Sequence, residues 1–293
     1  MKKSFSIILL FVALTLICSG CGNNTNTNIA EYGNSNEIIV VSREDGSGTR
    51  GAFIELFGIE QKNDDGTKKD LTTKEAIIAK QTDVMMTNIS GNKDAIGYIS
   101  LGSLNNTVKA IQIEGVTPTT DNVKNKTYPI ARPFIITTKG EPSGVAGDFV
   151  DFILSAEGQS VVAASYIPVL EYAPSYAGFK PSGKIVVAGS SSVTPVMEKL
   201  KEAYILLNPN ANIEIQQSDS SAGINGAIEG TCDIGMSSRE LKDNELSALI
   251  STQIAIDGIA VIINKNNTAD DLSIDQIRNI FTGTTLYWNE VTK

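Results

Sequence analysis

The chain has 293 residues, a formal net charge of −9, no histidine and three cysteines. Because histidine is absent, the chain cannot build a Ser-His-Asp or Cys-His catalytic site or a histidine-bound metal centre. The acidic balance excludes a general nucleic-acid binder, which needs a basic face. Hydrophobic residues make up 41% and charged residues 19%, so the chain is neither disordered nor a polytopic membrane protein.

The first twenty residues predict a signal peptide rather than part of a fold. Two lysines precede an apolar run over residues 5–17, which is too short for a permanent membrane span. Small residues then precede Cys21, and a polar tract at 22–28 follows it. This pattern is typical of a bacterial lipoprotein cleavage site, although Cys18 stands where leucine is usual. An ordinary secretory signal is the alternative.

Lipidation at Cys21 would define where the protein resides. We expect residues 1–20 to be removed and Cys21 to carry a lipid such as palmitate, with residues 21–36 as a flexible tether. The globular part would then be extracytoplasmic, held at the outer face of the cell membrane through the N-terminal lipid only. Cys232 would be left without a partner, so no intramolecular disulfide is expected.

From residue 37 onward, short β-rich runs alternate with helical stretches. In chain order, the pattern predicts a strand at 38–41, a helix at 51–57, strands at 96–100, 108–113 and 133–138, a helix at 148–164, a linker at 172–183, a strand at 185–188, a helix at 195–207, a strand at 213–216, a helix at 222–229, strands at 232–235 and 258–264, and a helix at 273–281. Such alternation predicts an α/β fold with mainly parallel sheets.

Three predicted strand-to-helix junctions are rich in glycine and hydroxyl side chains, at residues 43–50, 189–195 and 218–223. A helix N-terminus exposes unpaired N–H groups, glycine allows a close approach of an oxyanion, and serine and threonine add uncharged donors. One such junction alone would indicate an ordinary helix cap. Three of them at the carboxyl ends of strands favour an anion site, because open α/β sheets bind ligands there.

These junctions and other motifs resemble one known family. The motifs are residues 40–50, 96–102, 189–196, 233–239, 257–261, 280–283 and Trp288. They resemble the phosphate-binding lipoproteins of bacterial phosphate-specific ABC transporters, over nearly the whole chain from Glu37. The resemblance implies a two-lobed, periplasmic-binding-protein-like α/β fold (type II), a clamshell that closes around phosphate in its cleft.

The order of the motifs differs from the order usual in that family, in which the 189–195 type of motif comes first. The chain therefore resembles a circular permutant, joined through the 172–183 linker; a misassembled gene is the alternative. Permutation requires the old chain ends to be close, so Val291 and Glu37 should be neighbours. The resemblance then implies one lobe from residues 37–106 plus 265–293 and another from residues 107–264.

The resemblance also implies a set of phosphate contacts and a role for each. Arg43 would offer paired N–H donors to phosphate oxygens, and Asp45 would pair with Arg43 and orient it. The remaining donors would stand at helix starts, with the register within residues 190–192 left open. The expected contacts are Arg43, Ser47, Gly48 and Thr49 from one lobe and Ser191, Ser192, Ser221 and Asp233 from the other.

Asp233 would set the selectivity of such a site. Phosphate at neutral pH still carries a proton, which it can donate in a hydrogen bond to a carboxylate. Sulfate carries none and would leave the aspartate unpaired. An aspartate that merely caps a neighbouring turn is the alternative reading of this position.

We therefore predict a binding protein that captures inorganic phosphate and delivers it to the permease subunits of an ABC transporter. It would be a monomer that uses no cofactor, no metal and no nucleic acid, and it would not be an enzyme. The alternatives are a binding protein for sulfate, molybdate or another oxyanion, and a surface phosphate sensor or adhesin. A phosphatase or phosphotransferase fits poorly, because the sequence lacks histidine and an evident activated nucleophile.

Overall fold

The computed structural model describes residues 36–63 and 68–291. The predicted signal peptide, Cys18, the predicted lipid site Cys21 and the tether up to residue 35 lie outside these residues. Within them, no helix combines the length and the apolar character that a membrane span requires. Cys232 is buried and is the free cysteine of this part of the chain.

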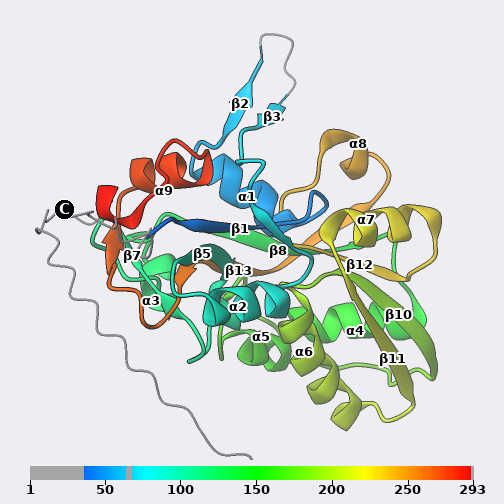
Figure 1. Cartoon of the computed structure of the whole chain (residues 1–293). Coiled ribbons are helices and arrows are strands. Elements are labelled where there is room, and N and C mark those ends of the chain that lie inside the picture. Colours follow the sequence, from blue (N-terminus) through cyan, green and yellow to red (C-terminus); the bar gives the residue numbers. More distant parts are fainter. Residues whose placement is uncertain (1–35, 64–67, 292–293) are drawn as a thin grey trace, which may run out of the picture. The chain divides into compact units, whose positions relative to one another are not determined.

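The first part of the fold, here called the β1 lobe, is built around three parallel strands in the order β4-β1-β5. Figure 1 shows β1 between α1 and α2. Helices α1 and α9 cover one face with Phe53, Tyr98 and Phe281 in the core, and α2 covers the other with Met85 and Ile89. The elements are β1 (Ile39–Arg43), α1 (Gly48–Leu56), β2 (Glu60–Lys62), β3 (Lys68–Asp70), β4 (Ile77–Ala79), α2 (Thr82–Gly91), β5 (Ala95–Ser100), the 3-10 helix η1 (Leu101–Ser103), β6 (Lys109–Ala110), β7 (Gln112–Ile113), α3 (Thr120–Lys124), β14 (Asp271–Leu272), α9 (Ile274–Phe281) and the 3-10 helix η2 (Trp288–Glu290).

The second part, the β10 lobe, is built around the parallel strands β11-β10-β12. Its α4–α6 face buries Phe149, Leu200 and Val187, and α7 packs on the opposite face with Ile224 and Ala227. The elements are β8 (Ala131–Thr138), α4 (Gly144–Leu154), α5 (Ala156–Val162), β9 (Ile167–Pro168), β10 (Gly183–Ser190), α6 (Thr194–Leu207), β11 (Ala211–Ser218), α7 (Ser220–Glu229), β12 (Ile234–Ser237) and α8 (Asp243–Leu246).

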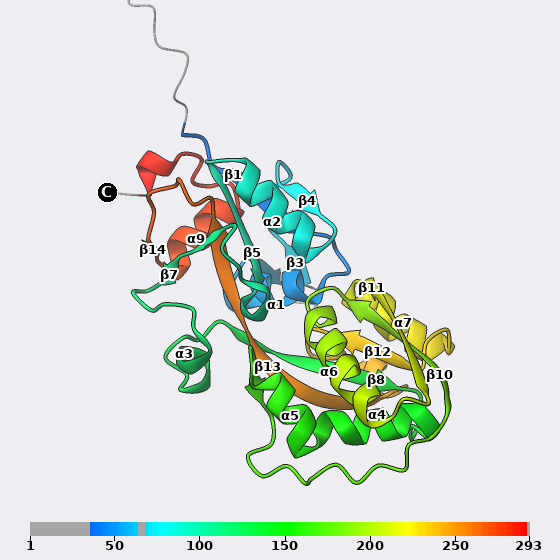
Figure 2. The same cartoon turned by 90° about the horizontal axis from the view of Figure 1, so that it is seen from below.

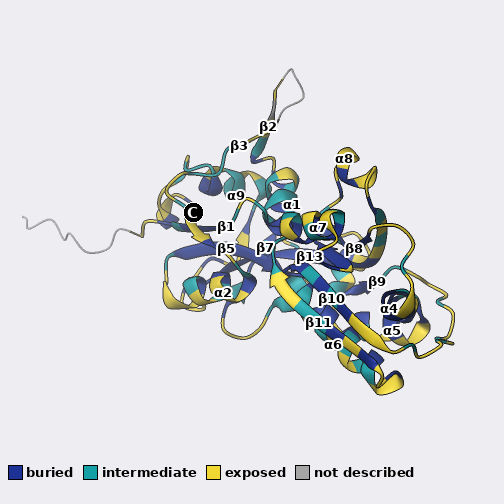
Figure 3. Cartoon of the chain, turned by 90° about the vertical axis from the view of Figure 1, so that its right-hand side faces the viewer, coloured by how far each residue is buried: buried dark blue, intermediate teal, exposed yellow. Residues whose placement is uncertain are grey.

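One long strand, β13 (Ile250–Ile263), belongs to both lobes. It pairs antiparallel with β8 through its first part and with β5 through its last part, so it runs from the β10 lobe into the β1 lobe (Figure 2). The sheet is consequently mixed, whereas the sequence predicted mainly parallel strands. A run of apolar residues reveals a buried strand but not its direction, and this difference follows from that limit. Figure 3 shows β13 and β5 buried along most of their length.

Several predicted elements have different bounds in the structure. The predicted helix at 148–164 is two helices, because Ser155 leaves helical geometry and caps α5 by accepting a hydrogen bond from Gly158 N. The predicted strand at 108–113 is divided between β6 and β7, which pair with different partners. Strand β12 begins at Ile234, two residues later than predicted. This last shift changes the candidate site, as described below.

The two ends of the described chain meet, as the sequence predicted. Glu37 forms an antiparallel bridge with Tyr287, and Trp288 N donates to Asn36 O at 2.8 Å. The circular permutation itself stays a prediction. The division into one lobe of residues 37–106 plus 265–293 and another of residues 107–264 also stays a prediction. It concerns which parts of the chain move together when the lobes close. In the packing, Ile111 and Val123 belong to the core of the β1 lobe.

Gly223 marks a close approach between α7 and the sheet of the β10 lobe. A Cβ atom at this position would lie 2.7 Å from Ala188 O, and the backbone of β10 cannot move without disturbing its pairing. We therefore expect Gly223→Ala to lower the free energy of unfolding by about 1–3 kcal/mol, as overpacking does. Urea denaturation of purified protein measures this change.

Gly91→Ala is the matched control, since Gly91 is also helical and a Cβ atom there would meet nothing within 4 Å. Alanine should leave stability unchanged or raise it slightly, because it restricts the unfolded chain. Equal stabilities for the two variants would contradict the close approach at Gly223.

Candidate anion-binding site

The carboxyl ends of the parallel strands of the two lobes face each other. Thr49 Oγ1 and Ser192 Oγ form a hydrogen bond of 2.7 Å between the lobes, and Ser221 N donates to Gly46 O at 3.2 Å. The loops that follow β1, β10, β11 and β12 are therefore brought to one place. This is the edge at which open α/β sheets bind ligands, and the sequence predicted it from the composition of three of these loops.

Arg43, at the end of β1, is the buried cation of this site, with 1% of its surface exposed. Its Nε and Nη2 atoms donate to the two carboxylate oxygens of Glu44 at 2.9 and 2.7 Å. Nε also donates to Ala79 O, Nη1 to Thr82 Oγ1 at 3.4 Å and Nη2 to Ser191 Oγ at 3.0 Å. These contacts fix the plane of the guanidinium and leave an N–H of Nη1 for a ligand.

The start of α1 supplies backbone donors beside Arg43. Ser47 is the N-cap and accepts from Arg50 N, and the first intrahelical bond runs from Gly51 N to Ser47 O. The N–H groups of Gly48 and Thr49 therefore precede the helical hydrogen bonds, as expected for an anion-binding helix start. All four predicted residues of the β1 lobe (Arg43, Ser47, Gly48 and Thr49) lie together here.

Three buried serine hydroxyls of the β10 lobe form a group, and two of them face Gly48. Ser190 Oγ donates to Ser238 Oγ at 2.9 Å, and Ser220 Oγ lies 3.3 Å from Ser238 Oγ. A Cβ atom on Gly48 would lie 2.5 Å from Ser220 Oγ and 2.8 Å from Ser238 Oγ. Glycine is thus required here for the two lobes to meet. Ser191 and Ser192, which the sequence predicted, lie beside this group, each within reach of Arg43 or Thr49.

Asp233 does not lie in the site, and its predicted contact is corrected. It precedes β12, so it stands at the amino end of a strand whose carboxyl end lies in the site. Its carboxylate accepts from Val186 N at 2.7 Å, and the residue is exposed. Asp233 is therefore structural, although it bonds the neighbouring strand β10 rather than capping a turn as the alternative reading had it. The residues at the carboxyl end of β12 are Ser237 and Ser238, and the strand-end rule applied to the true strand would have identified them.

Two further predicted roles are corrected. Ser221 Oγ accepts from Arg239 Nη2 at 3.4 Å rather than facing the serine group, where the adjacent Ser220 stands instead. Asp45 does not orient Arg43. Its side chain is 98% exposed and pairs with Arg50 at 3.1 Å, while the adjacent Glu44 makes the predicted contact with Arg43. Both errors are of one residue in a loop, where hydroxyl and acidic residues are adjacent and periodicity gives no register.

Tyr98 supports the Arg43 loop from beneath, and the sequence did not identify this role. Its phenol oxygen accepts from Arg43 N at 3.1 Å and shares a hydrogen bond of 2.8 Å with Ser42 Oγ. Burial raises the pKa of Tyr98, and its bonds to Ser42 and Arg43 offset this rise only in part. The phenol therefore remains protonated and neutral at physiological pH.

The chemistry of the site is that of fixed hydrogen-bond donors. Its cation is balanced by Glu44, and its other groups are hydroxyls and helix N–H groups. No cluster of three or more acidic, cysteine or histidine side chains that could hold a metal occurs within residues 36–63 and 68–291. Such an arrangement binds an oxyanion without metal ligands, and it does so with local dipoles rather than net charge.

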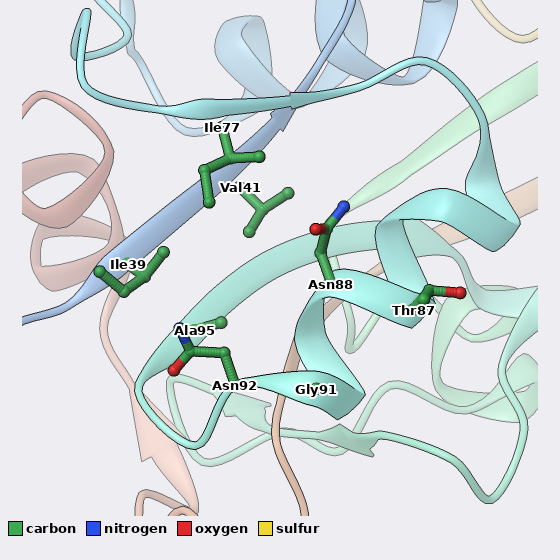
Figure 4. A pocket seen from close by; sticks show the side chains of 8 residues that line it. All are labelled: Ile39, Val41, Ile77, Thr87, Asn88, Gly91, Asn92 and Ala95. Carbon is green, nitrogen blue, oxygen red and sulfur yellow. The ribbon is translucent and has the colours of Figure 1, made fainter.

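A separate pocket lies between β1, β4 and α2 (Figure 4). It has a volume of about 230 Å³ and is lined by Ile39, Val41 and Ile77 together with the amides Asn88 and Asn92. All of its lining residues are neutral. It therefore lacks the charge complementarity of the Arg43 site and is not the candidate anion site.

Comparison with known proteins agrees with the class that this geometry defines, an α/β binding protein whose ligand site lies between two lobes. A PBP superfamily domain matches residues 20–157 and 174–293. The chain is 50% identical over 299 residues to phosphate-binding protein PstS 2 of Streptococcus agalactiae serotype V, with 100% of both chains covered. It is 44% identical over 273 residues to phosphate-binding protein PstS 2 of Streptococcus pneumoniae serotype 4, with 92% of each chain covered.

Among solved structures, the chain resembles the phosphate-binding protein of a phosphate ABC transporter from Streptococcus pneumoniae TIGR4. The TM-score is 0.69 at 44% identity, over 87% of this chain and 100% of that one. The chain therefore belongs to the PBP superfamily and, within it, to the family of the phosphate-binding proteins PstS. A match over the whole length of both chains also means that the S. agalactiae relative has the same order of segments, which speaks against a misassembled gene.

Removing the phenol oxygen of Tyr98 tests its support of the site. Tyr98→Phe leaves Ser42 Oγ and Arg43 N buried without this partner, and we expect a loss of about 1–3 kcal/mol in the free energy of unfolding. Denaturation in urea measures the loss. Tyr172→Phe is the control, because the side chain of Tyr172 is 89% exposed and its hydroxyl stays in water. A Tyr98→Phe protein as stable as the control would exclude the supporting role.

Proposed function

We propose that this chain binds inorganic phosphate outside the cytoplasmic membrane and delivers it to the permease subunits of an ABC transporter. The observation that carries the proposal is the buried guanidinium of Arg43. Glu44 fixes the orientation of its plane, and it is directed between two helix starts and a group of serines. The N–H of Arg43 Nη1 that these contacts leave can donate a charge-assisted hydrogen bond to an oxygen of a tetrahedral anion. The names of the relatives above support phosphate as the anion.

The proposed phosphate contacts follow the geometry of the site and differ in part from those expected from the sequence. From the β1 lobe they are Arg43, Ser47, Gly48 and Thr49. From the β10 lobe they are Ser191 and Ser192, as predicted from the sequence, with Ser190, Ser220 and Ser238 in place of Ser221 and Asp233.

Hydroxyl groups would also accept a hydrogen bond from the protonated oxygen of the ligand. The carboxylate of Glu44 already accepts two bonds from Arg43, and the buried carboxylate of Asp257 pairs with Arg132. A serine hydroxyl can donate or accept as it rotates, so it can match either a protonated or an unprotonated oxygen. A site of this kind admits sulfate as the second candidate ligand, because no fixed carboxylate would be left unpaired by it.

The remaining parts of the proposal concern the setting of the site. Lipidation at Cys21, with the described residues held at the outer face of the membrane, is supported by the sequence pattern at residues 5–28. We infer a carrier without catalytic activity, because the site offers donors to an anion but no nucleophile paired with a base. The monomeric state stays a prediction from the sequence.

Replacing Arg43 tests the central contact. Arg43→Lys keeps a positive charge but loses the planar pair of donors, and lysine cannot satisfy Glu44, Ser191 and a ligand at once. We expect phosphate affinity to fall about 10- to 100-fold, the worth of hydrogen bonds to a charged group. Isothermal titration with phosphate measures the change.

Arg278→Lys is the matched control for that titration. Arg278 on α9 also bonds a carboxylate (Asp275) and a backbone carbonyl (Phe57 O), but it lies outside the candidate site. Its replacement should leave affinity unchanged. Equal affinities of the Arg43 variant and the unsubstituted chain would refute the proposed site.

Asp233→Asn tests the corrected selectivity. Because Asp233 stands at the far end of β12, the ratio of phosphate to sulfate affinity should be the same in this variant as in the unsubstituted chain. Competition titrations with the two anions measure the ratio. A gain in sulfate affinity would mean that Asp233 reaches the ligand after all.

A further inference from the structure

A buried ion pair at the junction of the two lobes is unused by the contacts proposed so far. Arg132 on β8 donates through Nη2 and Nε to Asp257 Oδ2 on β13, at 3.1 and 3.4 Å. Both side chains are 1% exposed. Removing two charges from water costs more than a pair of this kind usually recovers, and apolar residues often serve as well. The presence of the pair therefore calls for a role other than stability.

The third contact of Arg132 leads to the site. Its Nη1 atom donates to the carbonyl oxygen of Ser238 at 3.3 Å. Ser238 is fully buried. Its N–H donates to Ser220 Oγ at 3.1 Å, and its hydroxyl accepts from Ser190 at 2.9 Å. The guanidinium thus holds the backbone of the residue whose hydroxyl faces Gly48.

Asp257 fixes the direction in which Arg132 points. Its Oδ2 accepts from two nitrogens of Arg132, so the guanidinium plane is held and Nη1 is left to reach Ser238 O. Its other oxygen, Oδ1, accepts from Gly102 N in the β1 lobe at 3.3 Å. The pair therefore connects the Ser238 loop of one lobe with η1 of the other, through the strands β8 and β13.

We propose that Arg132, oriented by Asp257, is a positioning residue for the phosphate site and acts through Ser238. It does not touch the ligand. By holding the Ser238 carbonyl, it sets the direction of the Ser238 hydroxyl toward Gly48 and toward the phosphate oxygen bound there. This inference rests on the proposed function, since it assigns a role within the same site.

A double-mutant cycle on the full chain tests the proposal. Phosphate affinity is measured by isothermal titration for the unsubstituted chain, Arg132→Lys, Ser238→Ala and the double variant. Lysine keeps the charge but cannot bond Asp257 and Ser238 O at once. We expect the phosphate affinity of each single variant to be lower by about fivefold or more, which is the effect of one lost hydrogen bond. The double variant should bind no more than about twofold more weakly than the poorer single one.

The outcomes separate a positioning role from a structural one. A pair that only stabilises the fold would lower the free energy of unfolding in urea and leave the phosphate affinity of the folded Arg132→Lys protein unchanged, and this overturns the proposal. Affinity losses that multiply in the double variant, as for independent residues, also overturn it. Arg278→Lys serves again as the distant arginine control.

Two provisions keep the test decisive. If Arg132→Lys does not fold, the same cycle is run with Asp257→Asn, which preserves the shape of the side chain and releases the orientation of Arg132. If the unsubstituted chain binds no phosphate, both the proposed function and this inference are refuted. If it binds phosphate and the cycle is multiplicative, the positioning role alone is refuted.

Discussion

The site depends on one constraint, the need to satisfy a guanidinium that has been removed from water. A buried cation without partners would destabilise the fold, so Arg43 must find acceptors on every side. Glu44 supplies two acceptors from the same loop, Ala79 in β4 and Thr82 at the start of α2 supply one each, and Ser191 supplies one from the opposite lobe. This last bond makes the approach of the two lobes part of what satisfies the charge. An anion that enters between them joins a network that is already oriented, and little reorganisation is needed.

Much of this arrangement follows from general rules applied to the sequence. Strands that alternate with helices predicted the α/β fold, and glycine- and serine-rich junctions at strand ends predicted the place of the site. The predictions failed where a rule needed an exact boundary. The sequence predicts a strand at 232–235, but the strand begins at Ile234, so Asp233 precedes it and lies at the end away from the site. Ser238 is a junction serine like the others, but it follows the true end of β12 rather than the predicted one, so the predicted strand does not point to it.

Pairing in three dimensions explains what no local pattern could show. Arg132 and Asp257 are 125 residues apart, and they meet only because β8 and β13 lie side by side. Tyr98 likewise reaches the Arg43 loop through the pairing of β1 with β5. In the sequence, Tyr98 belongs to the predicted strand at 96–100, whereas Arg132 and Asp257 stand just before the predicted strands at 133–138 and 258–264, and nothing local pairs them. Their contacts show that the donors of the proposed site are held by polar groups in the layer behind them, which is how a site made of short side chains keeps a fixed geometry.

Strand β13 also determines when this fold can be completed. Strands β5 and β8, one from each lobe, both pair with residues 250–263, so the sheet that joins the lobes is incomplete until nearly nine-tenths of the chain has been synthesised. Contacts between residues so far apart along the chain slow folding, because the entropy of closing a long loop is lost before the contacts contribute any stabilising energy. Strands β5 and β8 therefore remain without the strand that lies between them until the last part of the chain arrives. For a chain that crosses a membrane before it folds, such a delay is an advantage, since a polypeptide is exported most readily while its sheets are still open.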